Sequence, residues 1–256
     1  MSRIRNAFKN GKAFIAYITA GDPSLEKTEE FIFELERAGA DLIEIGIPFS
    51  DPVAEGEVIQ AANVRALKSG TSVHGVFELV RSIRQKSEIP LVFLTYLNPV
   101  FHYGYEKFFA KSAEVGIDGI IIPDMPFEEQ GELKDEAERH GIDIVSLIAP
   151  TSDERIEKIT KASKGFLYIV SSMGVTGVRS EISTDVEAIV KATKAVSNTP
   201  TAVGFGISTP EQAARFAKVA DGIIVGSAIV RIIEKHEASA GQHIYEYVKS
   251  IKSAMG

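Results

Sequence analysis

The sequence predicts an α/β protein in which eight parallel strands alternate with helices and close into a barrel. Short runs rich in Ile, Val and Leu recur along the chain without strict polar alternation, as in strands buried on both faces. Helical patterns, with apolar residues three and four positions apart, separate these runs. Eight strand–helix units make a (βα)8 barrel of roughly 250 residues, and the chain has 256 residues.

The predicted strands are short, and each leaves room for a helix after it. They span residues 13–19, 42–46, 91–94, 119–122, 144–147, 166–170, 202–204 and 222–225. Capping signals precede several of the intervening helices, among them Asp22-Pro23 and Ser208-Thr209-Pro210-Glu211. We therefore assign each apolar run to one strand of the barrel.

A repeated turn signal marks the passage from helix to strand. A glycine, a small or aliphatic residue and an aspartate follow one another in Gly39-Ala40-Asp41, Gly116-Ile117-Asp118 and Gly141-Ile142-Asp143, with a looser copy at Ala220-Asp221. Glycine readily adopts the left-handed backbone that ends a helix. The second and third copies are 25 residues apart, which is about the length of one strand–helix unit.

Three segments should form helices in addition to those of the eight strand–helix units. We expect a short amphipathic helix before the first strand, an extra helix in the second unit between residues 58 and 86, and in the eighth unit a helix at 229–234 ahead of the last helix at 241–254. No linker or change in composition divides the chain. We expect one domain over residues 1–256, with its active site at the carboxyl ends of the strands, where barrel enzymes have theirs.

The composition argues against several classes of partner and chemistry. A net charge of −7 argues against nucleic acid or an acidic membrane surface as the main partner. The absence of Cys excludes disulfides, thiolate zinc sites and a cysteine nucleophile, and it fits a reducing compartment. The five histidines lack the spacing of a metal site, so we expect no metal. No apolar run approaches the ~18 residues of a membrane span, and we expect a soluble, cytoplasmic protein.

One carboxylate interrupts the apolar run of the second strand. Glu44 lies in the middle of this run, and a loop with Asp51, Glu55 and Glu57 follows it. Burying an unpaired carboxylate costs several kcal/mol or raises its pKa. Glu44 is therefore a candidate general acid–base at the mouth of a pocket. The alternative is a structural ion pair between Glu44 and a neighbouring Lys or Arg.

Glycines cluster after the last three strands. They occur in residues 171–177, in Gly204-Phe205-Gly206 and in Gly226-Ser227, where a helix follows at once. Glycine lets backbone N–H groups approach an anion, and a helix N-terminus adds a favourable dipole. Barrel enzymes commonly bind phosphate with these loops, so we predict a phosphate site here, supplemented by Arg179. Ordinary turn chemistry is the alternative for each glycine.

Aromatic residues also lie near the predicted strand ends. Tyr17 belongs to the first strand, Tyr96 follows the third strand, and Phe205 separates two glycines after the seventh. Such side chains fit packing against a flat apolar substrate, and they fit an ordinary barrel core or rim as well.

Several stretches resemble the tryptophan synthase α subunit family. EIGIPFSDPVAEG, from Glu44 to Gly56, resembles its signature, and so do AYITAGDP (16–23), YLNPVFHYG (96–104), GIIIPDMP (119–126), SMGVTG (172–177) and the segments 204–208 and 226–230. The resemblance spans essentially the whole chain. It implies a (βα)8, or TIM, barrel that cleaves indole-3-glycerol phosphate to indole and glyceraldehyde 3-phosphate in tryptophan biosynthesis. It also implies that the chain needs no cofactor and works with a pyridoxal-phosphate-dependent β subunit in an α2β2 complex.

The same resemblance implies roles for individual residues. Glu44 matches the acid–base of the family, and Glu55 matches the loop acid that stabilises charge at the indole N–H. The substrate-binding positions match Tyr17, Tyr96, Thr176 and Phe205, and Thr176 would also orient the loop acid. The phosphate contacts match Gly177, Gly206, Gly226 and Ser227.

Two positions depart from the family pattern. The loop acid is usually Asp and the residue after Gly56 is commonly Pro, whereas this chain has Glu55 and Glu57. The extra methylene moves the carboxylate by about 1.5 Å, and a misplacement of ~1 Å can cost ~10²-fold in rate. One alternative is therefore a catalytically weak regulatory partner that activates the β subunit. Another is a different phosphate-binding barrel enzyme, although no strand end offers the Lys of a Schiff-base aldolase.

Overall fold

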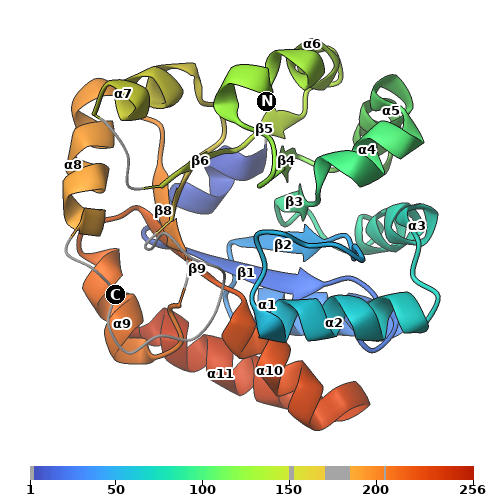
Figure 1. The fold of residues 1–256 in the computed structure, drawn as a ribbon. Helices are drawn as coiled ribbons and strands as arrows, with labels where there is room; N and C mark the ends of the chain where they lie inside the picture. Colours follow the sequence, from blue (N-terminus) through green and yellow to red (C-terminus); the bar gives the residue numbers. More distant parts are fainter. Residues whose placement is uncertain (1–2, 150–152, 171–184, 205) are drawn as a thin grey trace.

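The computed structural model describes residues 3–149, 153–170, 185–204 and 206–256, and its strands form a barrel. Nine parallel strands make one sheet in the order β5-β4-β3-β2-β1-β9-β8-β7-β6. The helices lie around the outside of these strands (Figure 1). The two strands at the ends of the sheet, β5 and β6, follow each other in the chain with only Val145 between them. Because they are two parts of one chain segment, the sheet closes on itself, as predicted for a (βα)8 barrel.

Four of the eight predicted strands keep their exact bounds, and three more differ by one residue at one end. They are β1 (Ala13–Thr19), β2 (Leu42–Gly46), β3 (Leu91–Leu94), β4 (Gly119–Ile121), β5 (Asp143–Ile144), β6 (Ser146–Ile148), β7 (Leu167–Val170), β8 (Thr201–Gly204) and β9 (Gly222–Val225). The predicted single strand at 144–147 is divided, because β5 pairs with β4 and β6 pairs with β7. Val145 lies at the switch and donates its N–H to the carbonyl of Ile120 at 2.9 Å.

Helices follow the strands in nearly every unit. They are α1 (Leu25–Arg37), α2 (Glu57–Lys68), α3 (Val73–Ile83), α4 (Leu97–Tyr103), α5 (Tyr105–Val115), α6 (Gly131–Arg139), α7 (Asp153–Ala162), α8 (Asp185–Val196), α9 (Pro210–Ala217), α10 (Ser227–His236) and α11 (Gly241–Ala254). Three short 3₁₀ helices accompany them: η1 (Arg3–Phe8), η2 (Phe127–Glu129) and η3 (Glu237–Ser239).

The extra helices lie in the second and eighth units, as predicted, and in one unexpected place. α2 and α3 follow β2, while α10 and α11 follow β9. The expected N-terminal helix is the 3₁₀ helix η1. The third unit also carries a second helix, α4, which we did not predict because a seven-residue segment containing Pro99 shows little helical periodicity. The N-cap of α1 is Ser24 rather than Asp22, and that of α9 is Thr209.

Apolar side chains form two concentric cores. The larger one lies between the strands and the helices and includes Phe77, Phe93 and Phe108. The smaller one fills the barrel with the alternate strand residues, such as Ile15, Leu42 and Tyr168. Because successive strand side chains point to opposite faces, this alternation shows which strand residues face the barrel interior.

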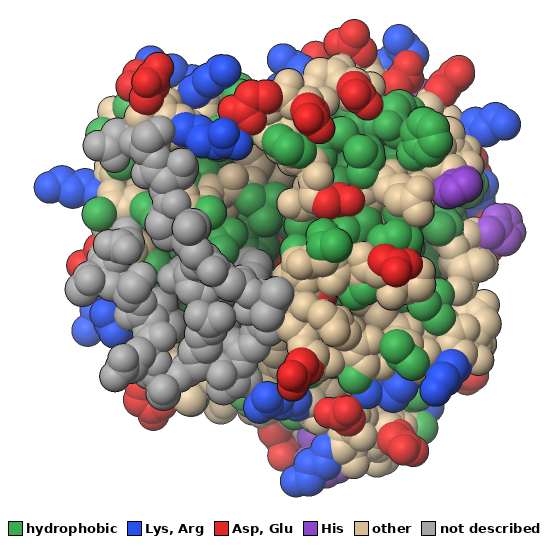
Figure 2. All heavy atoms as spheres, in the orientation of Figure 1, with side chains coloured by type: hydrophobic (Ala, Val, Ile, Leu, Met, Phe, Trp, Pro, Cys, Tyr) green, Lys and Arg blue, Asp and Glu red, His purple; other side chains and the backbone are tan. Residues whose placement is uncertain are grey.

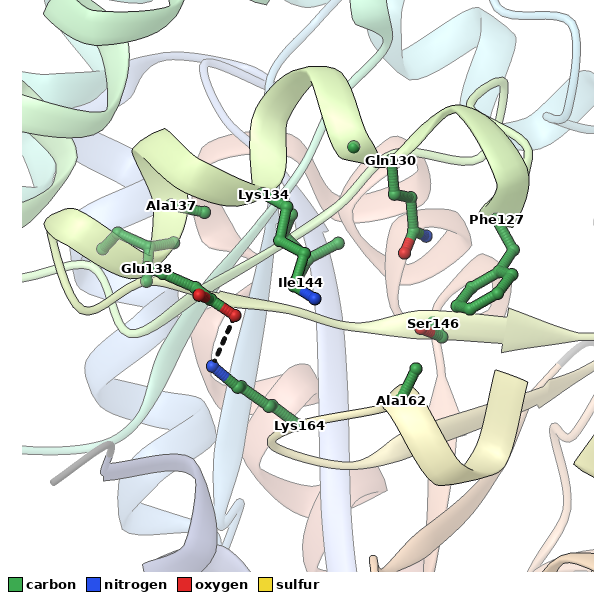
Figure 3. A pocket seen from close by; sticks show the side chains of 11 residues that line it. Phe127, Gln130, Lys134, Ala137, Glu138, Ile144, Ser146, Ala162 and Lys164 are labelled. Carbon is green, nitrogen blue, oxygen red and sulfur yellow. Dashed lines mark hydrogen bonds and ion pairs between the residues drawn. The ribbon is translucent and has the colours of Figure 1, made fainter. Parts of the chain in front are cut away.

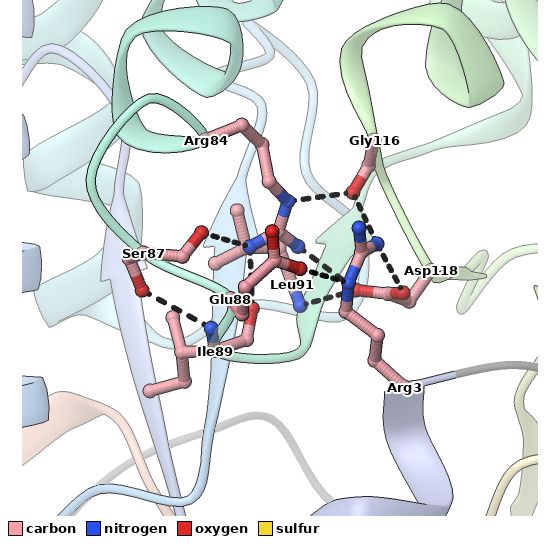
Figure 4. Close-up of polar contacts among 8 residues, drawn as sticks. All are labelled: Arg3, Arg84, Ser87, Glu88, Ile89, Leu91, Gly116 and Asp118. Carbon is pink, nitrogen blue, oxygen red and sulfur yellow. Dashed lines mark hydrogen bonds and ion pairs between the residues drawn. The ribbon is translucent and has the colours of Figure 1, made fainter.

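The N-terminal segment closes the bottom of the barrel, where the strands begin. Ile4 of η1 is fully buried in the interior core. Arg3 donates from Nη1 to Oδ1 of the buried Asp118 at 3.0 Å, and Arg84 donates from Nη2 to its Oδ2 at 2.9 Å (Figure 4). The site predicted at the opposite ends of the strands is therefore far from the N-terminus. No helix among the described residues is long and apolar enough to cross a membrane.

Candidate active site

Glu44 is a buried acid on the interior face of the barrel. It lies two residues after Leu42, which faces the interior core, and its side chain therefore points to the same side. Glu44 is 1% exposed, and neither of its carboxylate oxygens has a hydrogen-bond partner among the described residues. Burial, and then the negative charge of Glu55, raises the pKa of Glu44 to about 8. No Lys or Arg among the described residues forms the ion pair with Glu44 that was the alternative interpretation.

Glu55 lies on the loop between β2 and α2 and is also buried, with 3% of its surface exposed. Two contacts hold this part of the loop. Gln60, in the first turns of α2, donates its side-chain Nε2 to the carbonyl oxygen of Glu55 at 2.7 Å. Tyr96 accepts the N–H of Ala54 at its hydroxyl at 3.0 Å. The second acid is thus fixed close to the first, on the same end of the barrel.

The side chain of Tyr96 contacts that of Glu55, the acid on the loop after β2. Burial is the largest cause of the raised pKa of Tyr96, followed by the charge of Glu55, and a hydrogen bond to the Glu55 side chain contributes as well. The ring of Phe49 lies 5.4 Å from that of Tyr96, measured between centroids. The Tyr96 hydroxyl therefore links the third unit of the barrel to the acidic loop of the second.

Two tyrosines reach into the barrel next to Glu44. Tyr17 pairs with Glu44 in the register of β1 and β2, and its hydroxyl lies 3.2 Å from that of Thr19. Tyr168 faces the same interior from β7. Burial is the first cause of the raised pKa of both phenols. The charges of Glu44 and Glu55 contribute to both shifts, which places the two phenols near the acids.

Glycines on the neighbouring strands make room for these tyrosine hydroxyls. A Cβ at Gly46 would lie 2.3 Å from the hydroxyl of Tyr17, and a Cβ at Gly204 would lie 2.4 Å from that of Tyr168. Tyr168 was not among the predicted site residues. The available signal was its position two residues before the end of its strand, which matches that of Tyr17 in β1.

The described part of the predicted phosphate site lies on the loops after β8 and β9. Gly206 has a φ of +88°, a conformation that favours glycine. Gly226 is the N-cap of α10 and Ser227 is its first residue, so N–H groups of the first turn lack intrahelical partners. Gly226 also has a packing role, because a Cβ there would lie 3.2 Å from Tyr17.

Other predicted site residues lie outside the described part of the chain. They are Thr176, Gly177, Arg179 and Phe205. Among the residues that the structure describes, no group of three or more His, Asp or Glu side chains is arranged to hold a metal ion.

A separate cavity of about 210 Å³ lies between α6, α7 and the strands β5 and β6 (Figure 3). Phe127, Ile144 and Ser146 line it, and an ion pair of 2.8 Å between Lys164 and Glu138 lies at its side. None of the predicted site residues lines this cavity. It is therefore distinct from the site around Glu44.

The arrangement around Glu44 has the groups that acid–base chemistry requires. A carboxyl group with a pKa of about 8 is mainly protonated at neutral pH and can both give and take a proton. The Glu55 carboxylate can accept an N–H, and the first turn of α10 can bind an anion. The fold and this site together define a class of protein, namely (βα)8-barrel enzymes that act by acid–base catalysis on an anionic substrate.

Comparison with known proteins gives the family. The sequence model of the family described as tryptophan synthase alpha chain matches residues 4–255. The tryptophan synthase alpha chain of Lacticaseibacillus casei is 48% identical over 255 residues, which cover 100% of this chain and 96% of that one. The corresponding protein of a Thermoanaerobacter strain is 47% identical, with 100% of both chains covered. This chain belongs to the tryptophan synthase alpha chain family.

Solved structures agree with this assignment. The crystal structure of the alpha chain from Legionella pneumophila has a TM-score of 0.89 and 37% identity, with 100% of this chain and 97% of that chain covered. A structure described as the tryptophan synthase α2β2 complex of Pyrococcus furiosus has a TM-score of 0.88 and 37% identity over 95% of this chain and 99% of that one. The chain is accordingly a carbon–carbon lyase of tryptophan biosynthesis that acts on indole-3-glycerol phosphate.

Proposed function

We propose that Glu44 is the acid–base of the lyase reaction, in which indole-3-glycerol phosphate is cleaved to indole and D-glyceraldehyde 3-phosphate. The observation that carries this proposal is the burial of Glu44 without a hydrogen-bond partner among the described residues, at a pKa of about 8. The bond between the indole ring and the glycerol chain breaks when a proton reaches the indole carbon and a glycerol hydroxyl loses one. Protonated Glu44 delivers the first proton, and the resulting carboxylate accepts the second.

Glu55 stabilises the positive charge that develops on the indole ring. Protonation of the ring carbon makes the indole N–H more acidic, and a carboxylate that accepts this hydrogen lowers the barrier. Tyr96 supports this assignment because its hydroxyl holds the backbone just before Glu55, at Ala54.

The phosphate binds to backbone N–H groups at the last strand ends. Gly206, Gly226 and Ser227 are the described residues of this site, and the dipole of α10 favours an anion at its first turn. The proposed reaction uses the carboxyl groups of Glu44 and Glu55 for its proton transfers and charge stabilisation, and no cofactor is proposed.

We also propose an α2β2 complex with a tryptophan synthase β subunit in the cytoplasm. The structure from Pyrococcus furiosus is described as such a complex. Two large apolar side chains are exposed on segments that follow strand ends: Val53 on the loop after β2 (73% exposed) and Phe101 on α4 (65% exposed). Hydrophobic side chains gather on the same face, over α4 and α5 (Figure 2). An apolar surface of this kind fits a partner that covers the mouth of the barrel.

Indole release from indole-3-glycerol phosphate tests the acid–base role. The purified chain should release indole, and Glu44→Gln should lower kcat by about 10²-fold or more, in the range typical of general acid–base catalysis. Glu246→Gln is the matched control, because Glu246 is exposed on α11, away from the proposed site, and its substitution should leave kcat unchanged. Glu44→Gln should still bind inorganic phosphate.

Addition of a β subunit separates the two functional alternatives. Turnover by the wild-type chain, alone or with β, together with its loss in Glu44→Gln supports the catalytic role. A wild-type chain that releases no indole even with β, but stimulates the β subunit, would contradict it and favour the regulatory role suggested by Glu55 and Glu57.

A further inference from the structure

Two helices that begin at the proposed site lie against each other. α2 starts two residues after Glu55, and α10 starts at the proposed phosphate contact Ser227. Both helices pack on β1 and on each other. The apolar cluster around them consists of Tyr17, Ile59, Ala62 and Val230. The spacing between Glu55 and the phosphate-binding turn therefore depends on how these two helices are held together.

Arg65 joins the two helices near the C-terminal end of α2. It lies in the third turn of α2, and its Nε and Nη2 donate to the two carboxylate oxygens of Asp22, each at 2.8 Å. Its Nη1 donates to Oε1 of Glu234, in the last turns of α10, at 3.0 Å. One guanidinium thus connects the loop after β1, α2 and α10.

Burial differs strongly between the two carboxylates that Arg65 contacts. Asp22 is 1% exposed, whereas 49% of the Glu234 side chain and 32% of the Arg65 side chain are exposed. The bidentate hydrogen bond to the buried carboxylate of Asp22 fixes the orientation of the Arg65 guanidinium. A second contact helps to hold the end of α2, because the Ser69 hydroxyl donates to the carbonyl of Gly21 at 3.0 Å.

We propose that Arg65 is a positioning residue of the lyase reaction, which fixes α2 relative to α10 and thereby places Glu55 relative to the phosphate-binding turn. This inference rests on the proposed function. A helix behaves as a stiff rod, and Arg65 is eight residues, or about 12 Å, from the start of α2. A change of tilt at Arg65 consequently moves the first turn of α2, and misplacements of ~1 Å can cost ~10²-fold in rate.

The substitution Arg65→Lys separates positioning from simple stabilisation. A Lys keeps a positive charge beside the buried Asp22, but one ammonium group cannot make the planar two-bond contact and reach Glu234 as well. Arg81→Lys is the matched control. Arg81 also bridges two carboxylates, Glu78 on α3 and Glu114 on α5, away from the proposed site.

Steady-state kinetics of indole release, thermal unfolding and binding of inorganic phosphate should be measured for wild type and both variants. We expect Arg65→Lys to lower kcat by at least about fivefold. The Kd of inorganic phosphate should remain within about twofold of wild type, because the first turn of α10 is unchanged. We expect Arg81→Lys to leave kcat and KM unchanged, even where it lowers Tm as much as Arg65→Lys does.

A kcat of Arg65→Lys within twofold of wild type would overturn the inference and leave Arg65 as a structural brace. An equal loss of phosphate affinity would also overturn it, because the binding turn itself would then be disrupted. Should Arg65→Lys be unfolded at the assay temperature, Glu234→Ala decides, since it removes the contact between Arg65 and α10 and leaves that between Arg65 and Asp22. Unchanged kinetics of Glu234→Ala would overturn the inference. A wild-type chain without turnover would overturn the proposed function, and this inference with it.

Discussion

At the scale of single residues, the burial that suits Glu44 to proton transfer also lowers the stability of the folded state when Glu44 is ionised. Its carboxyl group lies in the barrel interior without an ion pair to any Lys or Arg that the structure describes, and the nearby charge of Glu55 adds to the cost of ionising it. A protonated carboxyl group avoids most of that cost. The environment that makes Glu44 a proton donor near neutral pH is therefore also one that destabilises its ionised form.

The stability of the protein should accordingly depend on pH through Glu44. The folded state holds this proton up to about pH 8, whereas an unfolded Glu releases it near its ordinary value of 4.5. Between these values the folded state binds more protons, so the free energy of unfolding falls as pH rises. The contribution that is present below pH 4.5 and lost by pH 8 amounts to at most ~5 kcal/mol, at 1.36 kcal/mol for each unit of pKa.

Glu44→Gln lacks this titration and should be more stable relative to wild type at pH 8.5 than at pH 5. Urea unfolding of both proteins at the two pH values measures the difference. If the difference in the free energy of unfolding between the two proteins is the same at pH 5 and pH 8.5, the raised pKa of Glu44 is contradicted.

The sequence identified the two acids but not all of their neighbours. Glu44 could be found because a carboxylate within an apolar run is chemically conspicuous. The contact between Tyr96 and the loop at Ala54 joins residues 42 positions apart, and Tyr168 lies more than a hundred positions from Glu44. A local sequence pattern cannot predict contacts between residues so far apart in the chain, because these contacts depend on the curvature of the closed sheet.

At the scale of elements, the aspartate that recurs after a helix also connects two neighbouring strands. Asp41, Asp118 and Asp221 each accept the backbone N–H of a residue at the start of an adjacent strand, namely Phe14, Leu91 and Thr201, at 2.7–2.9 Å. Each also pairs with a cation, provided by Lys252, Arg84 and Lys194 respectively. The same device therefore fastens neighbouring strands at the bottom of the barrel in three places.

Asp118 is the most buried of these three aspartates, and its loss should be the most costly. Asp118→Asn removes the negative charge that faces Arg84, whose side chain is 10% exposed, and Arg3. We expect a loss of about 3 kcal/mol in the free energy of unfolding, as for other buried pairs that lose one partner. Urea unfolding measures this loss.

Glu88→Gln provides the comparison for Asp118. Glu88 also pairs with Arg3, but its side chain is 77% exposed, so its substitution should change stability little. Equal effects of the two substitutions would contradict a special role for the buried aspartate.

Helices and strands can be predicted from the sequence only where the local pattern of apolar residues is long enough and ends clearly. The strands of the first three units were predicted with their exact bounds because each apolar run is flanked by turn residues. The division of the fifth strand at Val145 was not predicted, since pairing partners decide it and the apolar run continues through it. α4 was missed because seven residues are too few to establish a helical period.

At the scale of the whole molecule, closure of the barrel brings distant segments to one site. Glu44 and Glu55 come from the second unit, Tyr168 from β7, and Gly226 from the end of β9. Eight short strands could be counted from the sequence, and closure follows from that number. The distances between side chains inside the barrel do not follow from it, because they depend on register and packing across the sheet.

We expect the closed barrel to hold Glu44 protonated near neutral pH, ready to act on the substrate. The most direct measurement is the titration of the Glu44 carboxyl group in the folded chain, by carbon-13 NMR, with Glu44→Gln used to assign its signal. We predict a midpoint near pH 8. A midpoint near 4.5, the value of an ordinary Glu, would contradict the account.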